Sequence, residues 1–264
     1  MALGDGRRFR GRGVLVTGGT SGIGLAAARR LATEGASVVL VGRTPAKVVA
    51  AEQALCQAVA AEWAGHEELE PVVAGRVADV TDPAAMAEAA DAVLAIAGRF
   101  DVLVAAAGID GEGKDALDLD PAVFARVMEV NVGGLLVASQ AAARRMTDGG
   151  AIVLVSSVNA VATEAHFADY NASKGAAVLL ARTLAIDWAA RDIRVNAVCP
   201  GYVRTPMTEA YLDDPATLEE ILSNVPMGRV ADADEIAATI AFLASPEASY
   251  ITGSSLIVDG GRSA

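Results

Sequence analysis

Short apolar runs alternate with longer helical patterns along almost the whole of this 264-residue chain. Apolar runs of roughly four to eight residues are typical of buried strands. Seven are strand candidates: Gly13–Val16, Ser37–Val41, Val72–Ala78, Val102–Ala105, Ala151–Val155, Ile193–Val198 and Ser255–Val258. Six helical patterns lie between them: Ser21–Glu34, Pro45–Ala64, Pro83–Gly98, Pro121–Met146, Asp169–Ala190 and Asp232–Ala244. This alternation predicts an α/β fold, a doubly wound parallel sheet of seven strands flanked by helices, with right-handed crossovers.

The first strand leads into a glycine-rich turn. Val14-Leu15-Val16 is followed by Thr17-Gly18-Gly19-Thr20-Ser21-Gly22-Ile23-Gly24 and then by an alanine-rich helix. Glycines let the backbone approach a pyrophosphate, and the amides of the first helical turn face the anion. The spacing from Gly18 is G-x-x-x-G-x-G. Its strand-turn-helix context favours a dinucleotide phosphate site over a tight turn that binds nothing.

A second motif places a tyrosine and a lysine on one helical face. Tyr170 and Lys174 are four residues apart, and Ser157 precedes Tyr170 by thirteen. A neighbouring ammonium lowers the pKa of a phenol, which makes the pair a proton donor or acceptor, and a serine can bind the same substrate oxygen. On its own, the Y-x-x-x-K pattern describes many surface tyrosines and lysines, so the assignment depends on the rest of the chain.

Composition narrows the classes of partner. The net charge of −12 argues against nucleic acid and anionic membranes. The Arg7, Arg8, Arg10 and Arg12 cluster is interpreted as a solvated leader rather than a basic arm. Two cysteines and two histidines form no metal motif, and the cysteines are predicted to be free thiols. With no signal peptide or membrane span recognised, we predict a cytoplasmic protein.

In combination, these motifs resemble the short-chain dehydrogenase/reductase family, in its single-domain branch of about 250 residues. The matching pieces run in order from Gly13 to Gly261: the Thr17–Gly24 turn, Asp79-Val80, Gly108, Asn131, Ser157, Tyr170, Lys174, Pro200-Gly201 and Val258–Gly261. The resemblance implies a single Rossmann domain over residues 1–264 with strand order 3-2-1-4-5-6-7. It implies hydride transfer between NAD(P) and a ketone or secondary alcohol.

The resemblance also implies which residues contact the dinucleotide. They stand at the carboxyl ends of the predicted strands, where open parallel sheets bind ligands. They are Gly18, Thr20, Ser21, Gly22, Ile23, Gly24, Arg43, Asp79, Val80, Ala106, Ala107, Gly108, Tyr170, Lys174, Pro200, Gly201, Val203 and Thr205. Asp79 has an alternative interpretation, as a helix cap shared with Asp82. Ala106 and Ala107 stand where relatives carry asparagines, which puts the hydrogen-bond support of the central strands in question.

The end of the second strand bears on the choice of cofactor. An NAD enzyme usually has an acidic residue there to accept the ribose hydroxyls, and position 42 is glycine. Arg43 follows, and a guanidinium suits a 2′-phosphate. We therefore predict NADP. The alternative is NAD, with Arg43 as a solvated loop residue.

The family resemblance implies catalytic roles for four residues. Tyr170 would exchange the proton, Ser157 would orient the substrate oxygen, and Lys174 would lower the pKa of Tyr170 and bind the ribose. Asn131 would hold a water that joins the lysine to solvent, or else be an ordinary helix residue. The alternatives are a dinucleotide-binding sensor without turnover and an epimerase or dehydratase of the extended branch, which carries a larger C-terminal domain.

Substrate and assembly are less well defined. Residues 202–230 contain Pro206, Pro215 and Pro226 and are predicted to form a substrate lid. Asn159, His166, Tyr202 and Met207 are pocket candidates, with His166 interpreted as an exposed loop residue. No charge cluster is recognised, so a neutral ketone or alcohol is expected. A homotetramer is implied, with Pro121–Met146 and Asp169–Ala190 pairing between subunits through small residues such as Ala141–Ala143 and Ala176-Ala177.

Overall fold

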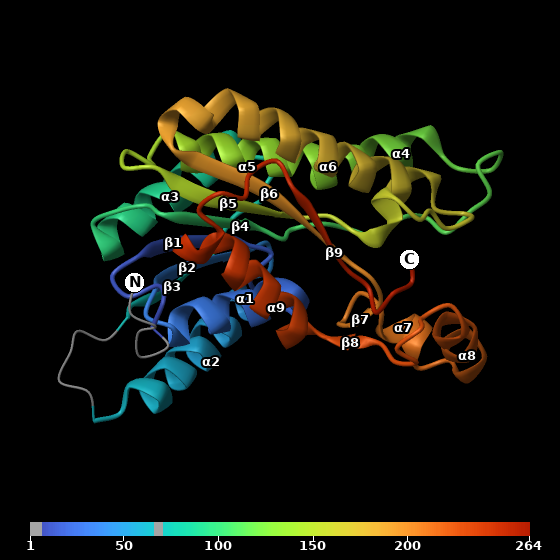
Figure 1. Ribbon diagram of the computed structural model, residues 1–264, viewed down its shortest axis with the longest axis horizontal. Coiled ribbons are helices and arrows are strands. Elements are labelled where there is room, and N and C mark those ends of the chain that lie inside the picture. Colours follow the sequence, from blue (N-terminus) through green and yellow to red (C-terminus); the bar gives the residue numbers. More distant parts are fainter. Residues whose placement is uncertain (1–6, 66–70) are drawn as a thin grey trace.

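The computed structural model describes residues 7–65 and 71–264, and its centre is a parallel sheet (Figure 1). The strand order β3-β2-β1-β4-β5-β6-β9 is the predicted one, and every pair is parallel. The strands of this sheet are β1 (Gly13–Thr17), β2 (Ser37–Gly42), β3 (Val73–Val77), β4 (Val102–Ala105), β5 (Gly150–Val155), β6 (Ile193–Pro200) and β9 (Ser255–Val258). The predicted fold class is confirmed.

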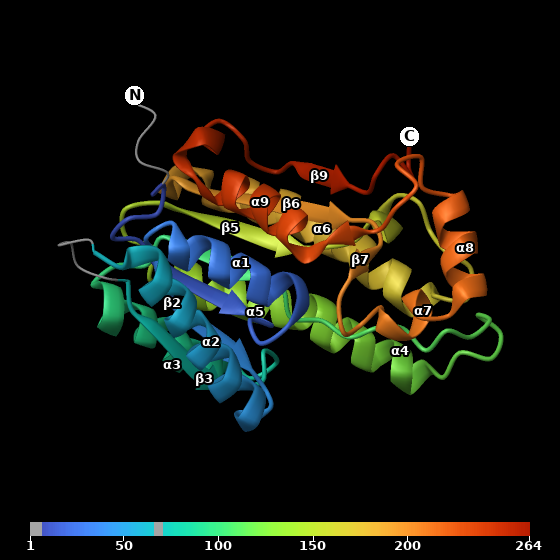
Figure 2. The same cartoon turned by 90° about the horizontal axis from the view of Figure 1, so that it is seen from below.

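Helices cover both faces of the sheet (Figures 1 and 2). One face packs against α1 (Gly22–Thr33), α2 (Pro45–Trp63) and α9 (Ala233–Ala244). The other packs against α3 (Pro83–Ala97), α5 (Gly134–Ala143) and α6 (Ala168–Trp188), with α4 (Pro121–Met128) beside α6. Short helical turns η2 (Val158–Ala160), η3 (Ala189–Arg191) and η4 (Pro246–Ala248) complete these connections.

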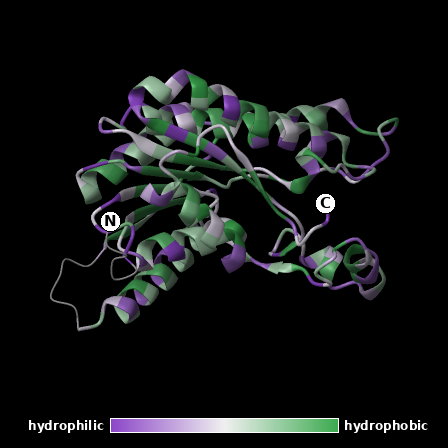
Figure 3. Ribbon diagram, in the orientation of Figure 1, coloured by the Kyte–Doolittle hydropathy of each residue, from purple (hydrophilic) through white to green (hydrophobic). Residues whose placement is uncertain are grey.

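The central strands are apolar because helices cover them on both sides. Every residue of β1 and of β4 is buried. Figure 3 shows the hydrophobic colour gathered on the strands and on the helix faces that meet them. The apolar runs of the central strands therefore form the core, with residues facing both helix layers, whereas the edge strands β3 and β9 contain no buried residue.

Aspartate caps and proline set several helix starts. Asp82 accepts hydrogen bonds from the Ala84 and Ala85 amides, and Asp120 accepts one from the Ala122 amide, each with proline at the next position. Gly98 ends α3 in the left-handed region at φ 70°. These boundaries lie within a residue of the predicted ones.

The predicted helix Pro121–Met146 differs from the observed one. It is interrupted by a π-helical turn, η1 (Glu129–Gly133), and ends at Ala143. The run Pro121–Ala143 is long and apolar enough to cross a membrane, but length and composition alone are weak evidence for a membrane span. Here it packs against α3 and α6 and buries Asn131 at its centre.

The basic N-terminal cluster is not a solvated leader in its described part. Arg8 pairs with Glu34 at 2.7 Å and with Glu247 at 3.1 Å, and Arg12 pairs with Asp101 at 2.6 Å. These contacts hold the segment before β1 against the body of the protein.

The segment after β6 forms a separate lobe beside the sheet's carboxyl edge (Figures 1 and 2). It contains β7 (Val203–Arg204), α7 (Glu209–Leu212), α8 (Pro215–Ser223) and β8 (Ala231–Asp232). Strands β7 and β8 form a small parallel sheet that the sequence analysis did not predict. The predicted lid at 202–230 corresponds to this lobe.

Candidate active site

A cavity of about 320 Å³ runs along the carboxyl edge of the sheet. It is lined by Gly18, Thr20, Ser21, Gly22, Ile23, Gly24, Arg43, Asp79, Val80, Ala106, Ala107, Gly108, Tyr170, Lys174, Pro200, Gly201, Val203 and Thr205, together with other residues. These are all the residues that the sequence analysis assigned to the cofactor. The structure thus brings together segments from positions 18 to 205, and we call this space the first cavity.

The glycine-rich turn fits a phosphate group. A side chain at position 24 would lie 2.3 Å from the Gly18 carbonyl oxygen, so only glycine allows this close turn. Ser21 precedes α1 and makes no side-chain hydrogen bond to the helix amides among the described residues. The first helical amides of α1 therefore remain available for an anion, whereas Asp82 caps those of α3.

Two basic residues that lie close in sequence line the first cavity. Arg43 follows β2 and is exposed, and Lys47 lies in the first turn of α2. The sequence analysis did not single out Lys47, although it lies four residues after Arg43. Gly42 leaves the space that Thr20 fills, because a Cβ at position 42 would lie 2.5 Å from Thr20 Cγ2.

Asp79 is engaged in a local turn. Its Oδ1 accepts hydrogen bonds from the Thr81 amide at 2.9 Å and the Thr81 hydroxyl at 2.8 Å. These hydrogen bonds, led by that of the Thr81 amide, lower the pKa of Asp79. The helix cap is made by Asp82 alone, and Asp79 Oδ2 lies 3.9 Å from an Arg126 nitrogen.

Other groups replace the missing asparagines after β4. Thr17 Oγ1 accepts from the Ala107 amide at 3.4 Å, which ties β1 to the end of β4. Asn131 Oδ1 accepts from the Ile109 amide at 2.8 Å, and its Nδ2 donates to the Ile109 carbonyl at 2.9 Å. The close backbone approach at Ala106–Gly108 therefore has support from both neighbouring segments.

Ser157, Tyr170 and Lys174 converge at the inner end of the first cavity. Ser157 follows β5, while Tyr170 and Lys174 lie one helical turn apart on α6. Lys174 Nζ lies 5.2 Å from the Tyr170 ring centre and donates to the Val155 carbonyl at 3.2 Å. The Lys174 ammonium thus occupies a fixed buried position beside the phenol.

The pKa values in this group depend mainly on burial. Burial lowers the pKa of Lys174 to about 8. Burial also raises the pKa of Tyr170, the Asp110 and Glu164 carboxylates raise it further, and the Ser157 hydroxyl opposes them. Burial and the two carboxylates together outweigh any lowering by Lys174, so the pKa of Tyr170 is raised and the protonated phenol is favoured.

Asn131 is not an ordinary helix residue. It lies in the π-helical turn η1, is 1% exposed, and also donates to Ser173 Oγ at 3.1 Å. A Cβ on Gly108 would lie 3.2 Å from Asn131 Oδ1 and 3.7 Å from Lys174 Nζ. The wide turn brings Asn131 into contact with the end of β4 and with α6, as π-turns often do at functional sites.

Thr208 organises the loop after β6 and was missed by the sequence analysis. Its hydroxyl donates to the Val203 carbonyl at 2.5 Å and accepts from the Thr205 amide at 3.1 Å. Thr205 lies over the glycine turn, 3.2 Å from the position of a Cβ on Gly22. No periodicity distinguishes Thr208 from the other threonines, so only the folded loop identifies it.

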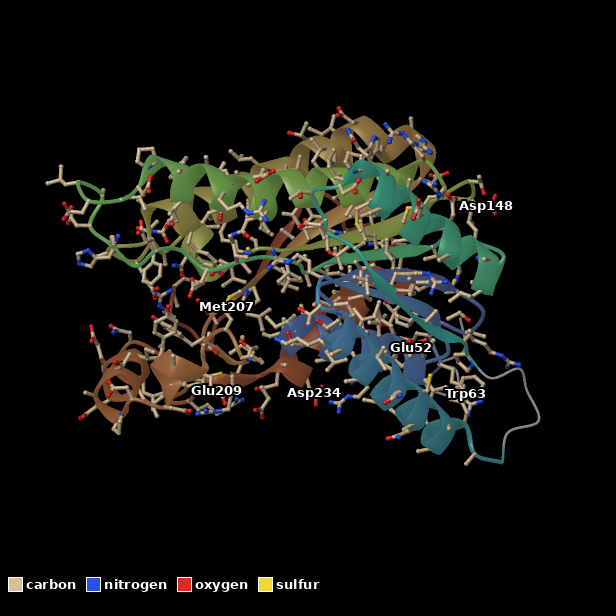
Figure 4. The ribbon with its side chains drawn as sticks, turned by 180° about the vertical axis from the view of Figure 1, so that it is seen from behind. Glu52, Trp63, Asp148, Met207, Glu209 and Asp234 are labelled. Carbon is tan, nitrogen blue, oxygen red and sulfur yellow. The ribbon has the colours of Figure 1, made fainter. Side chains whose placement is uncertain are left out.

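A second cavity of about 420 Å³ opens beyond Ser157 and Tyr170, which line both cavities. The candidates Asn159, His166, Tyr202 and Met207 all line it, and His166 is exposed as expected. In Figure 4, Met207 lies between the lobe of α7 and α8 and the layer of α4 and α6. We call this space the second cavity.

The second cavity contradicts the expectation that the pocket has no charge cluster. Asp110, Glu164, Glu220 and Arg262 line it. Arg262 Nη2 donates to Glu164 Oε1 at 2.8 Å across 98 residues of sequence. No motif marks these residues, because they come from four separate segments: Asp110 follows β4, Glu164 follows β5, Glu220 lies in α8 and Arg262 follows β9.

Comparison with known proteins settles the family. The family model described as "Enoyl-(Acyl carrier protein) reductase" matches residues 18–263. A short-chain type dehydrogenase/reductase from Mycobacterium ulcerans superposes with a TM-score of 0.91 at 33% identity, covering 97% of this chain and 90% of that one. The chain belongs to the short-chain dehydrogenase/reductase family.

Curated members of this family act on alcohols. Galactitol 2-dehydrogenase (L-tagatose-forming) of Cereibacter sphaeroides is 44% identical over 258 residues, covering 96% of each chain. Cis-4-hydroxycyclohexanecarboxylate dehydrogenase of Sinomonas cyclohexanicum is 40% identical over 262 residues, covering 98% of this chain and 99% of its own. The protein is an oxidoreductase that uses a nicotinamide dinucleotide, and the comparisons give no support to a non-catalytic sensor.

Proposed function

We propose that the protein is an NADP-dependent oxidoreductase that interconverts a secondary alcohol and a ketone, with Tyr170 as its acid and base. The observation that carries this proposal is the position of Ser157 and Tyr170, which line both cavities. A dinucleotide in the first cavity supplies the hydride chemistry. Tyr170 lies where one side chain reaches from the cofactor space to the substrate space.

In ketone reduction, Tyr170 donates its proton to the substrate oxygen. Its raised pKa keeps the phenol protonated at neutral pH, so the proton to be transferred is present. Ser157 donates a hydrogen bond to the same oxygen and stabilises the charge that develops there. The reverse oxidation needs Tyr170 as a base, so it gains from higher pH.

Lys174 and Asn131 act behind these two residues. Lys174 is buried with the Val155 carbonyl as its acceptor, and its ammonium favours the phenolate that forms when Tyr170 gives up its proton. Asn131 hydrogen-bonds to the Ile109 backbone and to Ser173 Oγ. The Ser173 hydroxyl in turn donates to the Tyr170 carbonyl at 2.8 Å. We assign Asn131 a positioning role.

The NADP preference rests on two basic residues of the first cavity. Arg43 and Lys47 both line it, and Gly42 offers no carboxylate to the ribose hydroxyls. Two cations near one site suit a 2′-phosphate better than two free hydroxyls. NAD as the preferred cofactor is the alternative.

We also propose a homotetramer in the reducing cytoplasm. Leu179 and Ile186 on α6 are 62% and 79% exposed, and Leu256 and Ile257 are exposed on the edge strand β9. These residues give two apolar surfaces for subunit contacts. Ala141–Ala143 and Ala177 are buried inside the subunit, so the expected small-residue contact does not involve them.

Light scattering at micromolar concentration tests the assembly, and a monomer mass for the wild type contradicts it. Ile186→Glu together with Leu179→Glu is expected to lower the mass, while Arg76→Glu on the edge strand β3, outside both proposed surfaces, is a control for added charge. The localisation proposal is supported by Cys199, a buried free thiol.

The function is tested with a panel of alcohols and ketones, followed by nicotinamide absorbance with NADP and NAD. We expect turnover of at least one alcohol–ketone pair and a higher kcat/KM with NADP. No turnover of any pair with either cofactor contradicts the proposal.

A further inference from the structure

The second cavity carries more acidic than basic side chains. Asp110, Glu164 and Glu220 line it against the single guanidinium of Arg262, with His166 at an exposed position. This balance leaves the cavity negative, which disfavours an anionic substrate through like-charge repulsion. A neutral substrate that donates hydrogen bonds meets no such penalty.

Glu164 is held in one orientation at the wall of the second cavity. Its Oε1 accepts hydrogen bonds from Arg262 at 2.8 Å and from the Tyr202 hydroxyl, and its Oε2 accepts from Asn159 Nδ2 at 3.4 Å. The Glu164 and Arg262 side chains are 25% and 12% exposed. A carboxylate has about four lone-pair sites, so Glu164 retains capacity for a ligand.

The Glu164 cluster is connected to the catalytic serine. Asn159 lies between them, because the Ser157 hydroxyl donates to Asn159 Oδ1 at 3.4 Å while Asn159 Nδ2 reaches Glu164. Asn159 is held further by Asn171 Oδ1 at 2.9 Å. Glu164 is therefore held in a fixed relation to Ser157, with Asn159 between the two.

A second carboxylate that accepts a hydrogen bond from a tyrosine hydroxyl lines the same cavity. Asp110 Oδ2 accepts a hydrogen bond from the Tyr211 hydroxyl at 2.8 Å. Carboxylates beside phenols and a guanidinium provide acceptors and donors side by side, which matches hydroxyl groups that both donate and accept. Phe167 and Ile221 add apolar wall for C–H groups.

We propose that the second cavity selects a neutral polyhydroxylated substrate, a polyol or the matching hydroxyketone, with Glu164 and Arg262 as its specificity residues. This inference rests on the proposed function, since it names the substrate of the same site. Glu164 accepts hydrogen bonds from substrate hydroxyls, and Arg262 fixes Glu164 and donates to hydroxyl oxygens. A site built to bind hydroxyls rejects analogues that lack them, because its buried polar groups are then left unpaired.

The test compares three alcohols with NADP and with NAD: galactitol as the neutral polyol, cyclohexanol as the neutral alcohol without further hydroxyls, and cis-4-hydroxycyclohexanecarboxylate as the anion. We expect kcat/KM for galactitol to exceed the other two by at least about tenfold, since each lost hydrogen bond to a charged group costs roughly one to two decades. A wild type that prefers cyclohexanol or the carboxylate overturns the inference and leaves the proposed function standing. Turnover of no alcohol or ketone in the wider panel overturns both.

Single substitutions distinguish a loss of substrate recognition from a loss of folded protein. Glu164→Gln and Arg262→Met are each expected to lower kcat/KM for galactitol by about 10- to 100-fold, chiefly through KM, and to change that for cyclohexanol by less than about threefold. Glu219→Gln removes an exposed carboxylate of α8 that does not line the cavity, and is expected to match the wild type. NADP affinity and Tm, measured for each variant, show whether the fold is kept. Equal losses for both alcohols in folded variants overturn the assignment of these residues.

Discussion

Thr20 occupies the space that a side chain at position 42 would need. A Cβ on Gly42 would lie 2.5 Å from Thr20 Cγ2 and 3.1 Å from its hydroxyl. The glycine turn after β1 and the end of β2 are therefore matched to each other. The absence of an acidic residue at position 42 therefore has an explanation in packing that does not depend on which cofactor binds.

Replacement of Arg43 tests the cofactor preference directly. Arg43→Ala is expected to lower kcat/KM with NADP by about 10- to 100-fold and to leave NAD within about threefold, because NAD lacks the 2′-phosphate partner. Arg43→Lys keeps the charge but loses the planar fork, so it is expected to fall between the two. An unchanged NADP/NAD ratio in Arg43→Ala would mean that Arg43 is only a solvated loop residue.

A reversal toward NAD requires a pair of substitutions. Gly42→Asp alone is expected to lower turnover with both cofactors, since its Cβ forces Thr20 and the phosphate turn to shift. Thr20→Ser removes the obstructing Cγ2, so Thr20→Ser with Gly42→Asp is expected to favour NAD in kcat/KM. Thr20→Ser alone is the control and should keep the wild-type preference. A clean reversal by Gly42→Asp alone would show that the contact with Thr20 is easily relieved.

Removal of the Tyr170 hydroxyl tests the proton transfer. Tyr170→Phe keeps the ring against Lys174 and is expected to lower kcat by about 100- to 10,000-fold, the usual contribution of an acid–base group. The dissociation constant of NADPH, measured by fluorescence, should change little. Near-normal turnover with any good substrate is incompatible with the mechanism.

Neutralisation of Asp110 is expected to shift the pH profile of alcohol oxidation. The carboxylate raises the pKa of Tyr170, and oxidation needs the deprotonated phenol, so kcat/KM rises with pH. In Asp110→Asn this rise should move to lower pH. Asp118→Asn, on the exposed loop before α4, is the matched control. A profile that stays in place in Asp110→Asn would show that Asp110 does not act on the phenol.

Lys174 is expected to reduce the stability of the protein at neutral pH. Its pKa is lowered from 10.5 to about 8, so the unfolded chain binds more protons between these values and stability rises as pH increases through that window. Below pH 8 the full cost is present, about 3 kcal/mol.

Lys174→Met removes this cost and should therefore raise the free energy of unfolding at pH 7. The lost hydrogen bond to the Val155 carbonyl reduces that gain by about 1 kcal/mol. Denaturant unfolding at pH 7 and pH 9.5 measures both the gain and its decline at higher pH. Turnover should be lost in the same variant. A Lys174→Met protein less stable than the wild type at pH 7 would contradict the linkage argument.

The sequence was sufficient to predict the features that depend on local pattern. β1 and β4 are buried throughout because helices cover both faces, and Asp82 and Asp120 cap helices at the predicted points. The cofactor residues could be placed together because carboxyl ends of parallel strands share one edge.

What the sequence did not predict depends on contacts between distant segments. Arg262 reaches Glu164 from the loop after β9, and Thr208 braces a loop through backbone groups that no pattern encodes. The π-helical turn at Asn131 was also missed, because an added residue within a helix leaves the apolar periodicity on either side intact. The raised pKa of Tyr170 depends on burial, which spacing along a helix does not reveal.

The two cavities have only a narrow set of lining residues in common among those described: Ser157, Tyr170, Gly201, Met207 and Thr208. Arg43 and Glu164 each line only one of the two cavities. Their substitutions are therefore expected to add in free energy. Cofactor and substrate preference can therefore be altered separately, in the laboratory or by descent. A descendant of this protein could draw on a different pool of reducing equivalents and still recognise the same alcohol.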